Sequence, residues 1–331
     1  MVCRRKTQRI DVSTHSYALS LTYASPYADG MIHDATRRAA TSRSYLMCPP
    51  EHFAVSYAIN PWMRPDKPAD AGAAMAQWER LRQVYLDLGH SVSVIDPVPG
   101  LPDMVFAANG ATVVDGTVLG VRFRHPERAP EARAYLDWFR MRGWPSVHVP
   151  EFVNEGEGDI LVAGAGFPRP TDPDRPPGFP RPTDPDRPPV LIAGYGFRSD
   201  VEASGELSRV FGRPVVSVRL VDPRFYHLDT ALCVLDSSTA MYYPAAFDDA
   251  GRAALASVFG ELIEAKDEDA EVLGLNAVSD GYHVVLAAEA TGLARQLASR
   301  GFSPVPVDIS ELRKAGGGAK CCTLELREER R

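Results

Sequence analysis

A degenerate repeat constrains the fold of this chain more than any other feature, and it recurs at intervals of roughly 40–55 residues. Five times, a stretch with helical character ends at Gly or His and leads into a short strand rich in β-branched residues. These five strands are Ser91–Ile95, Pro145–Val149, Pro214–Val218, Leu262–Ala265 and Pro304–Asp308. The helix before the first strand is predicted to begin after an N-cap, Asp70, and to bury an apolar face formed by Trp78, Leu81, Tyr85 and Leu88. The sequence therefore predicts a mixed α/β fold.

Four β-hairpins are predicted between these units. Two of them turn at an Asp-Gly pair, Asp115-Gly116 and Asp280-Gly281, which is a specific signal for a tight hairpin. The four hairpins cover 112–119, 159–163 with 190–194, 231–242 and 276–285. A fifth would require the segment 45–47 to pair with 322–326. The pattern indicates five ββαβ modules that close on themselves around a pseudo-fivefold axis, in a single domain.

Two segments do not fit the repeat. Residues 1–42 show no sustained periodicity and are predicted to be a flexible N-terminal extension, which leaves 43–327 for the domain. The segment 166–177 is rich in proline and is followed at once by an identical copy, 178–189. So many prolines exclude a helix interior or a central strand, so we expect a duplicated loop insertion at 166–189 within a hairpin.

Charge and composition exclude several functional classes. The 36 Lys and Arg residues against 43 Asp and Glu residues lack the basic excess that nucleic-acid binding requires. No apolar run is long enough to span a bilayer, and no apolar signal region follows the N-terminus, so a cytoplasmic location is expected. Five cysteines in 331 residues are typical of reduced thiols rather than of a disulfide framework. The sequence leaves the oligomeric state open, including a homo-oligomer.

Polar residues capable of chemistry follow every helix–strand unit. These segments are Leu101–Asp103, Asn154–Asp159, Tyr226–Asp229, Leu275–Asn276 and Gly316–Cys321. Because equivalent loops in a ring of modules point at the same axis, we expect these segments to converge. The sequence thus predicts one site that contains Asp, Glu, His and Cys side chains.

Four of these segments resemble, in order, the motifs of the guanidino-group-modifying superfamily: Leu101–Asn109 (LPDMVFAAN), Glu155–Asp159 (EGEGD), His227–Asp229 (HLD) and Gly317–Cys322 (GGAKCC). This superfamily includes arginine deiminases, arginine dihydrolases, dimethylarginine dimethylaminohydrolases and amidinotransferases. The resemblance covers about residues 43–327 and implies the five-bladed α/β-propeller, or pentein, fold.

The resemblance also implies a covalent mechanism. No metal or other cofactor is expected, because Cys321-Cys322 is not a Cys-x-x-Cys pair and the glycines at 316–318 precede a strand-like segment rather than a helix. A guanidinium carbon is a poor electrophile, so a strong nucleophile must attack it while carboxylates hold the N–H groups. Cys321 matches the family's nucleophile, and His227 matches the acid that protonates the leaving amine and then activates water. Cys322 is interpreted as a packing residue, because cysteine is among the most buried residue types.

The position of the catalytic carboxylate differs from the family pattern. The common pattern has an acid three residues before the Asp of its Gly-Asp pair, where this chain has Gly156 between two glutamates. Glu155 is favoured as the catalytic carboxylate, and Glu157 is the alternative. Asp159 is predicted to accept hydrogen bonds from loop backbone.

Six residues match substrate-binding positions of the superfamily. Asp103 and Asp229 match acids that bind the guanidinium, and Asn109 stands where many relatives carry Asp. An amide can donate to a neutral ureido oxygen, so Asn109 and Asn60 favour an arginine dihydrolase, which attacks its own citrulline-like product. Arg128 and Arg198 match residues that bind the α-carboxylate; the alternative is that they are surface arginines.

The principal functional prediction is therefore a hydrolase that takes arginine to ornithine or citrulline plus ammonia. The alternative is a dimethylargininase, which converts dimethylarginine to citrulline and dimethylamine. The absence of the large helical insertion of bacterial arginine deiminases favours a dihydrolase or an enzyme of dimethylargininase size. An amidinotransferase is less favoured, because transfer requires that water be excluded and nothing in the sequence shows this. A non-catalytic pentein binding protein is also less favoured, because a ring that had lost its chemistry would lack Cys, His and acid together.

Overall fold

The structure is a computed structural model that describes residues 38–164 and 189–328. Of the predicted N-terminal extension, only residues 38–42 are described. The predicted proline-rich insertion lies outside the described residues except for Pro189.

Five separate three-stranded sheets make up the β-structure of the described chain, and none of them closes on itself. Each contains an antiparallel pair of strands, and the middle strand of the sheet also pairs in parallel with a third strand. The sheets are β3 (Thr112–Val114), β4 (Thr117–Leu119) and β5 (Ser146–His148); β6 (Ile160–Ala163), β7 (Val190–Tyr195) and β8 (Val215–Arg219); β9 (Leu232–Val234), β10 (Thr239–Tyr242) and β11 (Glu261–Glu264); β12 (Val278–Ser279), β13 (His283–Ala287) and β14 (Ser303–Val307); and β15 (Leu324–Glu325), β1 (Ser44–Met47) and β2 (Ser91–Val94).

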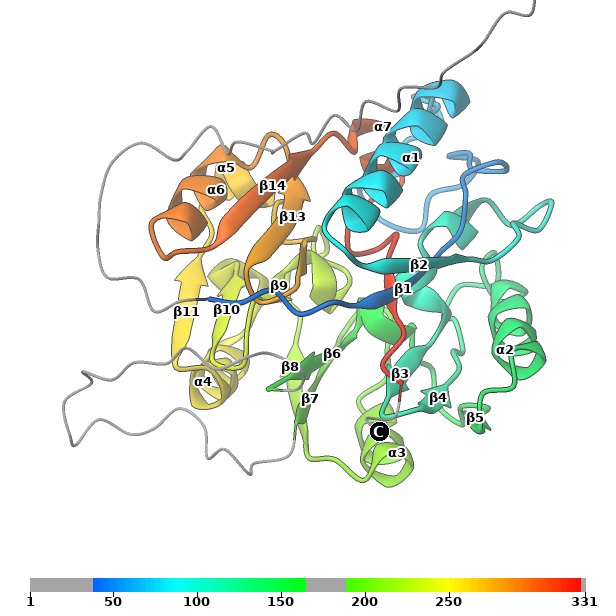
Figure 1. The fold of residues 1–331 in the computed structure, drawn as a ribbon. Coiled ribbons are helices and arrows are strands. Elements are labelled where there is room, and N and C mark those ends of the chain that lie inside the picture. The colour runs from blue at the N-terminus through cyan, green and yellow to red at the C-terminus, as the bar shows by residue number, and fades with distance from the viewer. Residues whose placement is uncertain (1–37, 165–188, 329–331) are drawn as a thin grey trace, which may run out of the picture.

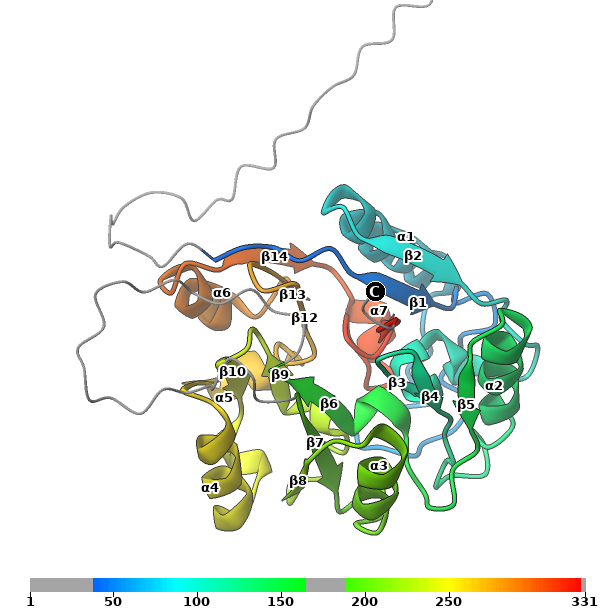
Figure 2. The same ribbon diagram turned by 60° about the horizontal axis from the view of Figure 1, so that its bottom comes forward.

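A helix connects the second and third strands of every sheet, and these helices lie on the outer side of the molecule (Figures 1 and 2). The five helices are α1 (Ala71–Asp87), α2 (Glu131–Met141), α3 (Ala203–Phe211), α4 (Asp249–Val258) and α6 (Thr291–Ala298). Two further helices of a single turn, α5 (Asp267–Ala270) and α7 (Ser310–Arg313), were not predicted from the sequence. Their shortness explains this, because four residues give no helical periodicity.

The predicted pairing of 45–47 with 322–326 is confirmed: Leu46 of β1 faces Leu324 of β15. The other four hairpins are confirmed as well. At the first of them, Asp115 and Gly116 have φ of 46° and 77°, as a two-residue type I′ turn requires. Helix α1 begins as predicted, because the Asp70 side chain accepts a hydrogen bond of 2.8 Å from the Ala73 backbone N–H.

Tight 3-10 turns lie directly before the first strand of three of the sheets. They are η1 (Pro102–Val105) and η2 (Ala107–Gly110) before β3, η3 (Gly156–Gly158) before β6, and η4 (Leu228–Thr230) before β9. Turn η3 contacts both η2 and η4. The predicted convergence of 154–159 with 226–229 is thus seen in the contacts, and each turn buries polar side chains.

Candidate active site

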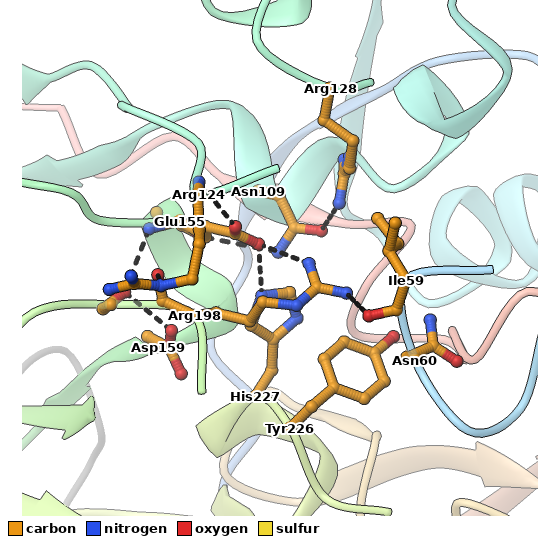
Figure 3. A network of polar contacts seen from close by, with 12 residues as sticks. Ile59, Asn60, Asn109, Arg124, Arg128, Glu155, Asp159, Arg198, Tyr226 and His227 are labelled. Carbon is orange, nitrogen blue, oxygen red and sulfur yellow. Dashed lines mark hydrogen bonds and ion pairs between the residues drawn. The ribbon is translucent and has the colours of Figure 1, made fainter. Parts of the chain in front are cut away.

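The buried Glu155 carboxylate contacts three residues from other loops, Arg124, Arg198 and His227 (Figure 3). Its Oε2 accepts a hydrogen bond of 2.8 Å from Nη1 of Arg198 and lies 2.7 Å from Nε2 of His227. Its Oε1 accepts from the backbone N–H of Arg124 at 3.2 Å. Burial raises the pKa of this carboxyl, but Arg198 and the hydrogen bond with His227 outweigh it and hold the pKa well below its usual range. Glu155 is therefore an anion that faces the imidazole.

Asp159 fixes the loop that carries His227. Its Oδ1 accepts from the Leu228 backbone N–H at 3.0 Å, as predicted for this residue, and its Oδ2 accepts from the Ser199 hydroxyl at 2.6 Å. Burial raises its pKa to about 6, although the nearby His227 and the Ser199 hydrogen bond act in the opposite direction. Asp159 thus fixes the backbone next to His227, and Glu155 contacts the imidazole itself.

Cys321 and Asp229 form a second buried cluster. The Cys321 thiol donates to Oδ2 of Asp229 at 3.3 Å, and its Sγ accepts from Nδ2 of Asn276 at 3.1 Å. Burial and the neighbouring Asp229 raise the pKa of the Cys321 thiol well above its usual range. In this structure the sulfur is therefore held as a protonated thiol between a carboxylate and an amide.

Burial raises the pKa of Asp229 to about 7, against a partial opposing effect of Lys320. The unfolded value is near 3.9, so folding favours the protonated acid. The stability that this protonation supplies is fully present below about pH 4 and is lost as the pH rises through about 7.

Replacing Asp229 by Asn should remove this pH dependence, because the amide is neutral throughout. The variant should gain stability over the wild type steadily between about pH 4 and 7, by on the order of a few kcal/mol at pH 8. Urea unfolding at a series of pH values measures the difference. Asp87→Asn on the exposed face of α1 is the matched control and should leave the profile unchanged. A constant offset between Asp229→Asn and wild type across this range would contradict the expected shift.

Asp103 and Arg128 belong to a third cluster, between η1 and α2. Oδ2 of Asp103 accepts from the Tyr57 hydroxyl at 2.9 Å, and burial raises the pKa of this acid. Arg128 binds Glu131 through two hydrogen bonds of 3.0 and 2.8 Å and donates to Oδ1 of Asn109 at 2.8 Å. Arg128 is only 3% exposed, so its interpretation as a surface arginine is wrong.

Arg198 is equally buried, at 2% exposure, and the surface interpretation is wrong for it too. Besides Glu155, it donates to the Ile59 carbonyl at 3.0 Å and lies over the Tyr226 ring, 4.5 Å from its centroid (Figure 3). Asn60, which follows Ile59 in the chain, is half-buried, and its Nδ2 donates a hydrogen bond of 3.0 Å to the Ala315 carbonyl. Asn60 thus ties the loop that follows β1 to the segment that leads to Cys321.

Glu157 lies away from His227, although only one residue separates it from Glu155. Its carboxylate binds Nζ of Lys320 at 2.6 Å, the guanidinium of Arg327 and the Glu325 backbone N–H at 3.1 Å. The structure therefore gives the two competing glutamates different partners.

Three buried polar atoms of these clusters have no hydrogen-bond partner within the described chain: Oδ1 of Asp103, Oδ1 of Asp229 and Nδ1 of His227. Unsatisfied carboxylate oxygens are costly to bury, so such atoms point to a ligand that donates hydrogen bonds. A nucleophilic sulfur, an imidazole paired with a carboxylate, and two acids with free lone pairs together suit covalent catalysis on a cation.

Sequence reasoning missed four residues that hold this arrangement: Asn276 on Cys321, Tyr57 on Asp103, Glu131 on Arg128 and Ser199 on Asp159. Only Asn276 had a signal, its place in the segment after the fourth helix–strand unit. The other three lie outside the motifs, and nothing in their local sequence distinguishes them from packing or surface residues.

Within 38–164 and 189–328, no group of three or more His, Cys, Asp and Glu side chains has the arrangement of a metal site. Over the same residues, no helix is long and apolar enough to cross a membrane.

Comparisons with known proteins identify close relatives. The N(G),N(G)-dimethylarginine dimethylaminohydrolase of Mycobacterium tuberculosis is 48% identical over 313 residues, which cover 95% of this chain and 92% of that protein. The bifunctional arginine dihydrolase/ornithine cyclodeaminase AgrE of Nostoc sp. is 35% identical over 302 residues, 87% of this chain but only 38% of AgrE. No protein-family model matches the sequence.

Solved structures agree with these relatives. The substrate-bound N-terminal domain of ArgZ, a cyanobacterial arginine dihydrolase, superposes with a TM-score of 0.76 at 33% identity, over 87% of this chain and 99% of that one. The citrulline complex of the Pseudomonas aeruginosa dimethylarginine dimethylaminohydrolase gives a TM-score of 0.66 at 18% identity, over 86% and 99% of the two chains, and supports the fold alone.

Proposed function

Since this chain belongs to the guanidino-group-modifying superfamily, we propose that it hydrolyses the terminal guanidino group of L-arginine through a covalent intermediate on Cys321. The products are ornithine or citrulline plus ammonia. The observation that carries the proposal is the pair of buried carboxylate oxygens, one on Asp103 and one on Asp229, that have no partner within the described chain. A guanidinium supplies the N–H donors and the positive charge that such oxygens lack.

We further propose that residues 43–327 form one catalytic domain with the five-bladed propeller arrangement of this superfamily. The identical strand order of all five sheets supports this arrangement. Contacts between the first strands of neighbouring sheets, β15 with β3, β6 with β9 and β9 with β12, support it as well. The pseudo-fivefold axis then passes between these first strands, close to Glu155 and His227, which directly precede η3 and η4, and to Cys321, which precedes β15.

The proposed chemistry follows from the contacts of Cys321 and His227. The bound cation lowers the cost of forming a thiolate. His227 takes the proton of the thiol, and the sulfur attacks the guanidinium carbon to form a C–S bond. The tetrahedral adduct breaks a C–N bond, and His227 protonates the departing amine. His227 then takes a proton from water, which attacks the carbon and releases the thiol. Glu155 stabilises the imidazolium form through its 2.7 Å contact with Nε2.

The same contact supports Glu155 over Glu157 as the catalytic carboxylate. Lys320 and Arg327 already neutralise Glu157. Glu155 is therefore the proposed partner of His227, and Glu157 the proposed structural anchor of the segment around Cys321.

Arg128 and Arg198 are proposed to bind the substrate α-carboxylate. An arginine carries five N–H donors, and Arg128 gives four to Glu131, Asn109 and the Asp103 carbonyl. Within the described chain this leaves one N–H. Arg198 has more donors left, because its described hydrogen bonds are those to Glu155 and the Ile59 carbonyl. Arg198 is therefore expected to make the larger contribution to carboxylate binding.

A second candidate substrate is asymmetric dimethylarginine, which the 48% identity to a dimethylarginine dimethylaminohydrolase favours. The free oxygen of Asp229 favours arginine, because a terminus without methyl groups offers more N–H donors to a carboxylate. Mass spectrometry of the products after separate incubation with L-arginine, citrulline and asymmetric dimethylarginine distinguishes the two. We expect arginine to be consumed. An enzyme that ignores arginine but releases dimethylamine from dimethylarginine would replace the first candidate by the second.

Asn109→Asp tests whether a second hydrolysis, of citrulline, takes place. Nδ2 of Asn109 donates to the Glu155 carbonyl at 3.3 Å, and its second N–H is the proposed donor to the ureido oxygen of citrulline. A carboxylate there offers only lone pairs to that oxygen, an unfavourable contact of about 1–3 kcal/mol. The variant should consume arginine and stop at citrulline, whereas the wild type proceeds to ornithine. Equal ornithine yields from both proteins would exclude this role for Asn109.

A further inference from the structure

The side chain of Asn276 makes two hydrogen bonds to Cys321. It is fully buried, and its Oδ1 accepts from the Cys321 backbone N–H at 3.0 Å. Its Nδ2 donates to the Asp229 carbonyl at 3.1 Å and to Sγ of Cys321 at 3.1 Å. The side chain thus holds the backbone and the sulfur of the same residue.

These partners fix the orientation of the amide. A backbone N–H can only donate and a backbone carbonyl can only accept, so Oδ1 must face Cys321 N and Nδ2 must face the Asp229 carbonyl. The second hydrogen of Nδ2 then points at the sulfur. The contact with Sγ is accordingly a donated hydrogen bond, which the negative charge of a thiolate strengthens.

We propose that Asn276 is a positioning residue that donates a hydrogen bond to the Cys321 sulfur and stabilises its thiolate for attack. This inference rests on the proposed function, in which Cys321 is the nucleophile. It adds a residue from the fourth helix–strand unit to a site whose recognised motifs come from the other units.

The charged and titratable groups around Cys321 explain why a donor is needed there. Burial, Asp229 on η4 and the adjacent Cys322 all raise the pKa of the Cys321 thiol and so disfavour the thiolate. Burial and then the nearby Cys321 raise the pKa of Tyr226, and Lys320 is the cation that lowers the pKa of Asp229. The Asn276 amide donates a hydrogen bond to the sulfur, and the Gly318 backbone acts in the same direction by lowering the pKa of the thiol. The neutral Asn276 amide stabilises the thiolate by its hydrogen bond. A cation in its place would also form an ion pair with the Asp229 carboxylate.

Gly318 makes the approach of Asn276 possible. A Cβ at position 318 would lie 2.7 Å from Oδ1 of Asn276 and 3.1 Å from its Cβ. Any side chain there must displace the amide. Gly318→Ala therefore perturbs the proposed hydrogen bond without changing Asn276 itself.

The test is the rate of alkylation of Cys321 by iodoacetamide in the full-length protein, followed by fragment mass spectrometry that separates Cys321 from Cys322. Only the thiolate reacts, so the rate at a fixed pH below the thiol pKa reports the thiolate fraction. Asn276→Asp keeps the acceptor for the Cys321 N–H and replaces the donor, and Asn276→Ala removes both. We expect at least a tenfold lower rate in both variants, and a smaller loss in the same direction in Gly318→Ala.

Asn154→Asp is the matched control, because Asn154 is also buried and its described hydrogen bonds are to the Phe152 carbonyl and the Gly156 N–H. Its alkylation rate should stay within threefold of wild type. Rates within threefold of wild type in both Asn276 variants, with melting temperatures showing that they fold, would overturn the proposal. So would an equal loss in Asn154→Asp.

Turnover supplies the second readout: kcat should fall at least tenfold in Asn276→Ala, while KM changes less than threefold. The alkylation assay needs no substrate, so it separates this inference from the proposed function. A wild type that turns over neither arginine nor dimethylarginine would refute the function, and the alkylation rates would still decide the role of Asn276.

Discussion

Cys321→Ser is expected to abolish turnover of the guanidino substrate, whereas Cys322→Ser should keep at least about a tenth of it, a difference of more than about 1.4 kcal/mol in the activation barrier. The two cysteines are adjacent and buried, but their surroundings differ. The Cys321 sulfur lies between the Asp229 carboxylate and the Asn276 amide. Cys322 packs in the hydrophobic core, where burial raises the pKa of its thiol.

Both variants should be compared at a temperature at which circular dichroism shows that they are folded. A hydroxyl in place of the Cys321 thiol keeps the size and the hydrogen bonds of the group but is a far weaker nucleophile near neutral pH. Wild-type protein incubated with substrate should carry a mass adduct on Cys321 after acid quenching. Equal loss of turnover in the two folded variants, or an adduct on Cys322, would refute the assignment of the nucleophile.

The four hairpins were predictable because their signals are local. Asp115-Gly116 has the φ angles that its composition indicates, and the β-branched runs occur as strands. The pairing of β1 with β15 joins residues almost 280 positions apart and came from the repeat, since four hairpins required a fifth. Internal repetition thus provided a long-range contact that local propensity does not contain.

The choice between Glu155 and Glu157 could not be made from the sequence, because alternating Glu and Gly gives no direction to either side chain. The structure shows what determines it. Gly156 has a φ of 59°, and a Cβ there would lie 2.8 Å from the Ala108 and Ala111 carbonyls. Position 156 therefore requires glycine, and the backbone conformation there directs the side chains of Glu155 and Glu157 to different partners. This conformation is visible only in the structure.

Asn276 illustrates a second limit of sequence reasoning. The repeat placed it among the converging segments, but a lone Asn carries no catalytic signature of its own. Its significance comes from its contacts with Cys321 and with the Asp229 carbonyl, which lie 45 and 47 positions away in the chain. Residues that act through another residue are identified by such contacts rather than by motifs.

The second large effect is expected from exchanging the two glutamates of η3 for Gln, one at a time. Glu155→Gln removes the anion that faces His227 and leaves the Arg198 guanidinium buried without its counter-ion. General acid–base catalysis by a positioned side chain contributes about 10²–10⁴-fold, so we expect kcat/KM to fall at least a hundredfold. Because an unpaired buried charge also costs about 3–5 kcal/mol of stability, turnover must be measured well below the melting temperature and expressed per folded molecule.

Glu157→Gln is the matched comparison, since both glutamates are buried in the same turn and the substitution is identical. Glu157 anchors Lys320 and Arg327, so its loss should lower the free energy of unfolding by a similar amount. Its effect on kcat/KM should stay within about tenfold, because none of its described partners is His227. Urea unfolding and steady-state kinetics on both variants separate stability from catalysis. If Glu157→Gln loses a hundredfold in kcat/KM while folded Glu155→Gln retains turnover, Glu157 is the catalytic carboxylate, and the contact between Glu155 and His227 serves the stability of the fold.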